Sequence, residues 1–185
     1  MVEFKGTKSS WGLVAKLFHW SLALLLFWQV ATGISLHNME FSPLKMGFII
    51  THKFFGTLVF SLVVLRLMWK YIFNNHPKYE NIPLFHRLVS NLVHFTLYGL
   101  VIFIPIQGTF MTWLEGGDVY MLGLIKIPSL IEENFILYPL ALNIHYYSAL
   151  ILTALFSLHI LAALYHRFII RDKYGVWKRM VFKRY

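Results

Sequence analysis

The sequence predicts an all-α fold, a four-helix transmembrane bundle in which the helices run up-down-up-down. Only 14% of the 185 residues are charged and 58% are apolar, whereas soluble domains are about a quarter charged. Four apolar runs are each long enough to cross a bilayer, because about 30 Å of hydrocarbon takes roughly 20 helical residues. The basic residues gather in the segments between these runs. Lipid is therefore the expected solvent of the folded chain.

We place the four spans at about 14–36, 46–72, 86–113 and 139–170, in a single domain over residues 1–185. The first two connections are short and contain proline. The third, residues 115–138, is the longest and only partly polar. Because its apolar residues would otherwise face water, we expect this segment to pack against the surface of the bundle.

The basic residues also orient the bundle. Fourteen of the 17 Lys and Arg residues fall on one side of the predicted membrane, and the exceptions are Lys45, Lys53 and Lys126. The positive-inside rule then places both termini in the cytoplasm, as an even number of spans requires. Basic residues spread between apolar runs do not make a nucleic-acid-binding face. The chain has no cysteine, so it cannot ligate an iron–sulfur cluster itself.

Nine histidines are many for a membrane protein, and ionisable residues at membrane depth usually mark function. His37, His76 and His86 fall in loops or at a helix boundary, where a solvated role is expected. His145 and His159 lie 14 residues apart in the last span. This spacing is nearly four helical turns, so both side chains lie on one face, about 21 Å apart along the axis.

The direction of each helix sets the depth of its histidines. The last span runs from outside to inside, so His145 lies near the outer face and His159 near the inner face. His19 begins the first span near the inner face, and His52 begins the second near the outer face. Depth therefore pairs His19 with His159 and His52 with His145. Each pair can bind a haem iron through two ring nitrogens, which leaves no open coordination position and suits electron transfer.

A small residue follows each of these four histidines by four positions, on the same helix face. These residues are Ala23, Gly56, Ala149 and Ala163. Small residues would let a flat porphyrin approach the helix, although they are also common at ordinary contacts between transmembrane helices.

Two further histidines lie in the inner half of the bundle. His94, in the third span, is an alternative ligand for the inner haem; otherwise it would hydrogen-bond within the core or to the haem edge. His166 follows His159 by two turns at the cytoplasmic boundary. Its imidazole can hydrogen-bond a quinone carbonyl and deliver a proton near neutral pH. An interfacial histidine without a ligand explains its position equally well.

Arg66 and Trp20 are candidate contacts of a cofactor. Arg66 follows His52 by 14 residues and lies near the inner surface, where its guanidinium can pair with a haem propionate. Trp20 is next to His19 and is expected to border the quinone. A positive-inside anchor and an aromatic belt are the alternative explanations for these two residues.

Several motifs, taken in order, resemble the bacterial cytochrome b561 family of four-helix dihaem membrane proteins. They are FHW at 18–20, HKFFG at 52–56, LRL at 65–67, HFTLYGL and IPIQG between 94 and 108, and IHYYSA and LHILAALYH between 144 and 166. The resemblance covers nearly the whole chain. It implies two b haems, ubiquinone as electron acceptor, and a multi-pass location in the bacterial inner membrane.

Carried onto this chain, the family's haem ligands fall on His19, His52, His145 and His159, and its quinone-associated position falls on His166. The family includes members that resemble superoxide oxidases. The resemblance therefore implies an oxidoreductase that passes electrons through two b haems to or from the quinone pool. A member of the superoxide oxidase type would take electrons from periplasmic superoxide and reduce ubiquinone. An anionic substrate favours positive charge at the outer mouth, but five acidic residues accompany the three outer lysines.

Other functions remain open on the sequence alone. The chain is alternatively the cytochrome b membrane-anchor subunit of a larger respiratory dehydrogenase of the hydrogenase or formate dehydrogenase type, with a redox partner subunit. A transporter or scaffold with histidine-lined helices is a third class. The pairing by depth disfavours that class, because proton-relay histidines have no reason to pair in this way.

Overall fold

Four long helices make up most of the described chain. The structure, a computed structural model, describes residues 3–7, 9–73, 77 and 82–182. The helices are α1 (Leu13–Asn38), α2 (Pro43–Met68), α3 (Leu84–Leu114) and α4 (Tyr138–Leu164), and π-helical turns extend α2 over Trp69–Phe73 (η1) and α4 over Tyr165–Ile169 (η2). All four are long and apolar enough to cross a membrane. The predicted four-helix transmembrane bundle is confirmed.

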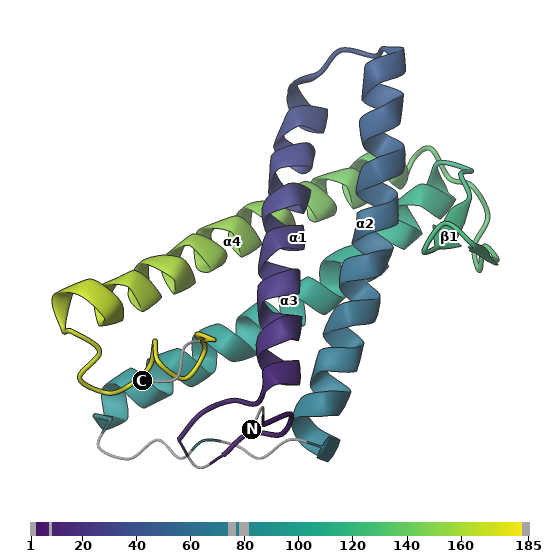
Figure 1. Cartoon of the computed structure of the whole chain (residues 1–185). Coiled ribbons are helices and arrows are strands. Elements are labelled where there is room, and N and C mark those ends of the chain that lie inside the picture. The colour runs from purple at the N-terminus through teal and green to yellow at the C-terminus, as the bar shows by residue number, and fades with distance from the viewer. Residues whose placement is uncertain (1–2, 8, 74–76, 78–81, 183–185) are drawn as a thin grey trace.

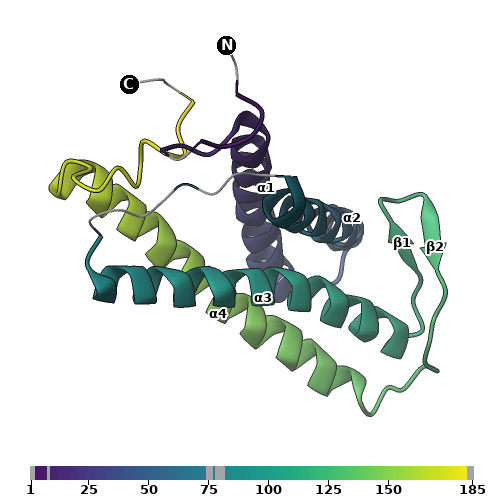
Figure 2. The same cartoon turned by 90° about the horizontal axis from the view of Figure 1, so that it is seen from below.

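The helices form two antiparallel pairs that cross each other. Figure 1 shows α1 beside α2 and α3 beside α4, and Figure 2 shows the same two pairs from below. The two ends of the described chain pack together: the Ser10 hydroxyl donates to the Arg179 carbonyl at 3.4 Å, and Trp20 Nε1 donates to the Met180 carbonyl at 3.1 Å. Both termini therefore lie at one end of the bundle, and the cytoplasmic assignment of that end stays a prediction.

Local sequence explains where the helices begin. Ser42 caps α2, because its side chain accepts a hydrogen bond from the Lys45 backbone N–H at 3.2 Å, and Pro43 occupies the first turn. Proline is favoured there because it has no N–H to leave unpaired. Pro139 has the same place in α4. Pro105 lies inside α3, which continues through it.

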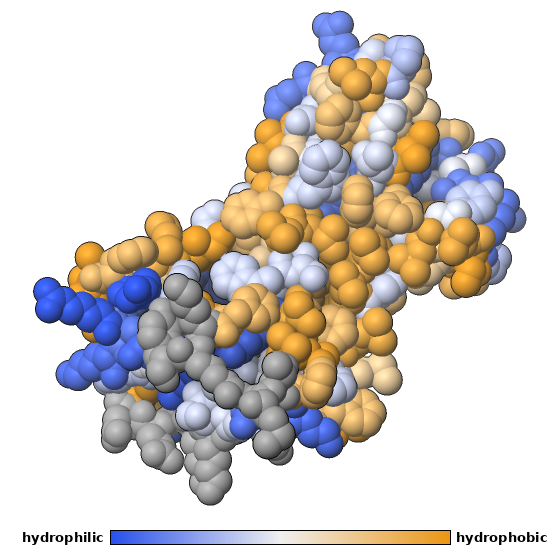
Figure 3. Space-filling view, viewed as in Figure 1, coloured by the Kyte–Doolittle hydropathy of each residue, from blue (hydrophilic) through white to orange (hydrophobic). Residues whose placement is uncertain are grey.

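The buried core lies at the middle of the bundle. Its residues are Leu22, Val59, Val63, Val101, Ile104 and Leu152. Leu152 is seven residues from both His145 and His159 on α4, which is about 10 Å along the axis in each direction. The core is therefore a layer between two levels of histidine. Figure 3 shows apolar side chains over the body of the helices and polar ones around the C-terminal end of α4.

Residues 115–138 contain a β-hairpin that the all-α prediction missed. Strand β1 (Val119–Met121) pairs antiparallel with β2 (Ile125–Ile127). The turn places Leu122 at φ 51° and Gly123 at φ 71°, a conformation that glycine adopts at low cost. The backbone N–H of Leu122 donates to the hydroxyl of Thr57 on α2 at 3.0 Å. The segment thus packs against the bundle, as expected, but as strands too short to recognise by alternation.

Candidate functional site

Two pairs of histidines face each other across helices. The ring centroids of His52 on α2 and His145 on α4 lie 6.2 Å apart, with the ring planes at 76°. His19 on α1 and His159 on α4 repeat this geometry at 6.2 Å and 75°. The structure thus brings together the same two pairs that depth along the helices predicts.

The spacing within each pair fits one metal ion between two imidazoles. A metal held about 2 Å from one nitrogen of each ring would separate the ring centroids by roughly 6 Å. Among the described residues, no group of three or more His, Asp or Glu side chains is placed to hold a metal ion. Two imidazoles without a third His, Asp or Glu ligand fit an iron whose remaining ligands come from a porphyrin.

A hydrogen bond sets the tautomer of His145. Its Nδ1 lies 2.9 Å from Oε1 of Gln107 on α3. The amide nitrogen of Gln107 donates to the Ala141 carbonyl, so the amide oxygen is the atom that faces His145 and accepts from it. His145 therefore carries its proton on Nδ1 and presents the lone pair of Nε2. Such a partner fixes the orientation of a metal-binding imidazole and increases its basicity.

His52 is held in the same way from α1. Its Nδ1 lies 3.0 Å from the hydroxyl of Thr32, a residue that is 2% exposed. That hydroxyl donates to the Trp28 carbonyl at 2.8 Å, so it accepts from His52 Nδ1. In addition, Gln29 Nε2 donates to the His52 carbonyl at 3.1 Å. Both histidines of this pair therefore present Nε2 for ligation.

Glycines rather than alanines lie closest to the rings of this pair. A Cβ at Gly108 would meet Cε1 of His145 at 3.0 Å, and one at Gly33 would lie 3.6 Å from Cε1 of His52. At Gly56 a Cβ would approach Nε2 of Gln29 at 3.2 Å. The sequence argument singled out Gly56 as room for a porphyrin, whereas its nearest neighbour is the side chain that holds His52. Gly33 and Gly108 were missed because they lie on helices other than that of the adjacent ring.

His94 lies beside the second pair. Its ring centroid is 5.2 Å from that of His159, which is shorter than the roughly 6 Å that a shared metal requires. Its Nδ1 lies 2.6 Å from the Ser90 carbonyl, and since a carbonyl only accepts, that nitrogen carries the proton. The geometry places His94 next to the pair of His19 and His159, edge-on to the His159 ring.

Arg66 lies at the same end of the bundle. Its Nε donates to the Tyr98 hydroxyl at 3.0 Å, and another guanidinium nitrogen donates to the Ala15 carbonyl at 3.4 Å. Ala15 is one helical turn before His19. The guanidinium has five N–H donors, so these two bonds leave donors for an anionic group near His19.

The two residues predicted near quinone have different surroundings. Trp20 packs against His19 with ring centroids 5.5 Å apart, but its N–H is used by the Met180 carbonyl. The ring centroid of His166, in η2, lies 6.3 Å from that of His86 and 6.2 Å from that of Tyr174. Its Nδ1 is buried without a hydrogen-bond partner. His166 therefore retains a free polar atom, whereas Trp20 does not.

Of the three histidines expected in solvated positions, His37 and His86 are exposed, and each also packs beside an aromatic ring. His37 stacks on Tyr146 with centroids 4.2 Å apart and planes at 17°. His86 lies beside His166 and Tyr174. His76 lies outside the described residues.

The lysines at the hairpin end differ in the groups that surround their ammonium groups. Lys126 forms a salt bridge with Asp118 at 2.9 Å, and this hydrogen-bonded carboxylate raises the pKa of Lys126. Lys45 donates to the Met39 carbonyl at 2.7 Å. Lys53, directly after His52, is half-buried beside Gly117. Of the three lysines predicted to lie outside, Lys126 is paired with Asp118, and Lys53 interacts electrostatically with Glu115.

Replacement of Gln107 by leucine tests the hydrogen bond to His145. It removes the acceptor of His145 Nδ1–H at nearly constant volume, and loss of such a partner typically lowers metal affinity about 10–100-fold. We expect weaker haem binding at the His52–His145 site only, measured by haem titration of the apoprotein. Thr153→Val is the control, because its hydroxyl donates only to the Ala149 carbonyl of its own helix. Equal affinity in Gln107→Leu and Thr153→Val would contradict the proposed orienting role.

Comparison with known proteins identifies similar sequences. The family model for prokaryotic cytochrome b561 matches residues 10–183. The cytochrome b561 homolog 2 of Escherichia coli (strain K12) is 25% identical over 189 residues, an alignment that covers 98% of this chain and 96% of the relative. All four paired histidines lie inside the matched region.

Proposed function

The chain belongs to the prokaryotic cytochrome b561 family of haem-binding membrane proteins of electron transfer, and from this premise we propose that it binds two b haems. His19 and His159 ligate one, and His52 and His145 ligate the other. The observation that carries the proposal is the equal centroid distance of 6.2 Å in both pairs. A stack of two such sites is a route for electrons from one face of the bacterial inner membrane to the other.

The haem, when bound, supplies an iron that accepts and releases one electron. The protein holds and orients it. Gln107 and Thr32 fix the imidazoles of His145 and His52 by hydrogen bonds. The apolar layer around Leu152 lies between the two sites and excludes water from the space between them.

Ligation by two histidines predicts that neither iron can bind an added ligand. Because two histidines would leave no position on the iron for another ligand, the absorption spectrum of the reduced protein should not change when carbon monoxide is added. A carbon monoxide complex at either site would contradict ligation by that pair. The spectrum of the reduced protein before carbon monoxide is added serves as the control for intact protein.

We propose that quinone binds at the end of the bundle that carries the termini, near His166. The free Nδ1 of His166 supports this assignment, because an imidazole can hydrogen-bond a quinone carbonyl and transfer a proton to it. Trp20 would contribute the face of its ring, since its N–H already has a partner. Ubiquinone takes two electrons and two protons to become the quinol.

The proposed electron donor is superoxide at the hairpin end. Two superoxide ions would each lose one electron and leave as dioxygen, and one quinone would become quinol. Lys53 follows His52 in the sequence and lies near Glu115, and its positive charge would attract an anion to this end of the bundle. With superoxide and ubiquinone, purified protein should form quinol, more slowly at high ionic strength because salt screens the attraction. Hydrogen peroxide as the reduced product, without quinol, would contradict superoxide oxidation.

Arg66 is proposed to hold a propionate of the haem between His19 and His159. Replacing it with glutamine removes a positive charge that favours the reduced iron, so the midpoint potential of that haem should fall. We expect a shift on the order of 60 mV, which corresponds to a tenfold change for one electron. Redox titration followed by absorbance measures it. Arg87→Gln is the control, and equal shifts in both variants would contradict a local role of Arg66.

A further inference from the structure

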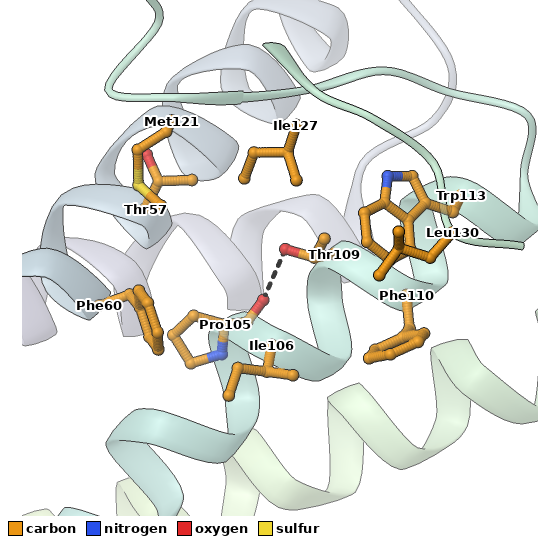
Figure 4. Close-up of a pocket in the computed structure, with 10 residues that line it drawn as sticks. All are labelled: Thr57, Phe60, Pro105, Ile106, Thr109, Phe110, Trp113, Met121, Ile127 and Leu130. Atoms are coloured by element: carbon orange, nitrogen blue, oxygen red, sulfur yellow. Dashed lines mark hydrogen bonds between the residues drawn. The ribbon is translucent and has the colours of Figure 1, made fainter. Parts of the chain in front are cut away.

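A cavity of about 210 Å³ lies between α2, α3 and the β-hairpin, apart from the histidine pairs. Figure 4 shows Phe60 of α2, Pro105 and Phe110 of α3, and Met121 and Ile127 of the hairpin around it. On α3 the lining extends from Pro105 to Trp113, one residue before the helix ends. That length is about 12 Å, so the cavity lies in the leaflet at the hairpin end.

The walls of the cavity offer almost no polar group to a ligand. Of the lining residues, the two threonines carry hydroxyls that are already used. Thr109 donates to the Pro105 carbonyl at 3.1 Å, the bond drawn in Figure 4. Thr57 donates to the Phe54 carbonyl at 2.9 Å and accepts from Leu122 at 3.0 Å. Trp113 Nε1 is buried and has no hydrogen-bond partner, so it is the one side-chain donor of the lining that is left free. A quinone ring has two carbonyl groups and would find only this one buried donor here.

An apolar cavity of this size does not hold stable water. Water needs two to four polar partners, and an apolar cavity of about 150 Å³ stays dry and binds hydrocarbons. The rim is open to the surface that meets lipid: Ile106 is 40% exposed, Phe110 41% and Leu130 74%. Hydrocarbon chains are the solvent at this depth.

We propose that this cavity binds an acyl chain of a membrane phospholipid from the leaflet at the hairpin end. The chain fills the space between α2, α3 and the strands and so holds the hairpin on the bundle. A lining with a single free side-chain donor, itself buried, selects a hydrocarbon chain, and the open rim lets it enter from the bilayer. This site is separate from the proposed quinone contacts at His166, which lie at the other end.

The test uses the complete haem-loaded protein in phosphatidylethanolamine bilayers that contain a trace of the same lipid with a photoreactive diazirine in its acyl chain. After illumination, labelled residues are mapped by mass spectrometry. We expect the label to concentrate on Met121, Ile127 and residues 105–113. Thr109→Phe, which fills the cavity, should lose this label. A uniform label along the lipid-facing sides of all four helices would overturn the proposal.

Thr96→Phe is the matched control. Thr96 is also on α3, and its hydroxyl donates to the carbonyl four residues earlier, at 3.0 Å. Thr96 does not line the cavity, so the labelling of the cavity residues in Thr96→Phe should equal that in the unmodified chain. Haem content is recorded for both variants, so that a misfolded protein is recognised. Displacement of the label by ubiquinone with a long isoprenoid tail, but not by extra phospholipid, would reassign the cavity to a quinone tail and overturn the proposal.

Discussion

Replacing His145 with alanine is expected to remove one of two haems and to leave the other in place. The ligand is lost from one pair, while the pair of His19 and His159 lies about 21 Å away along α4. Haem per chain, measured by the pyridine haemochrome of the purified variant, should fall by half. His37→Ala is the control, since this histidine stacks on Tyr146 and does not face another histidine in the way the pairs do.

Double variants test which histidines share a haem. Two substitutions at one site should cost no more haem than either alone, whereas substitutions at separate sites should add. His52→Ala with His145→Ala should therefore retain one haem, and His145→Ala with His159→Ala should retain none. Complete loss in the first double variant would mean that the pairs are assigned wrongly.

Gly108→Val is expected to disable the same site without touching a ligand. Even the Cβ of alanine would lie 3.0 Å from Cε1 and 3.3 Å from Nδ1 of His145, and valine adds two methyl groups. Overpacking of this kind usually costs about 1–3 kcal/mol. This cost of overpacking outweighs the stabilisation, roughly 1 kcal/mol at most, that the helix gains when a glycine is replaced. The ring must move from Gln107, and we expect haem at the His52–His145 site to be lost.

Gly99→Val is the matched control for this variant. Gly99 is on the same helix, and a Cβ there would meet nothing within 4 Å. It should keep both haems and have a thermal stability no lower than that of the unmodified protein. If Gly108→Val also keeps both haems, the close approach of α3 to His145 is not required for binding.

The four helices could be predicted from the sequence because a bilayer demands long apolar runs, and each observed helix begins and ends within three residues of its expected bounds. The β-hairpin could not be predicted. Its strands have three residues each, and its position depends on a hydrogen bond to Thr57, far away in the sequence. The π-helical turns at the ends of α2 and α4 have no periodicity that distinguishes them from α-helix.

The pairing of histidines followed from helix direction alone, since antiparallel helices bring the start of one to the level of the end of its neighbour. The residues that surround each ring could not be predicted from helix direction. Gln107 and Thr32 act across helices, so their partners depend on how the helices are rotated. A signal was present for Gln107: an amide in a long apolar helix is costly in lipid unless it has hydrogen-bond partners. Gly108 carried no such signal.

The central claim is that each chain holds two b haems between paired histidines. The most direct measurement is the haem content of the purified, unmodified protein by pyridine haemochrome, related to protein determined by amino-acid analysis. Two haems b per chain, with a reduced-minus-oxidised spectrum of low-spin cytochrome b, are the predicted result. One haem per chain, or none, would contradict the account.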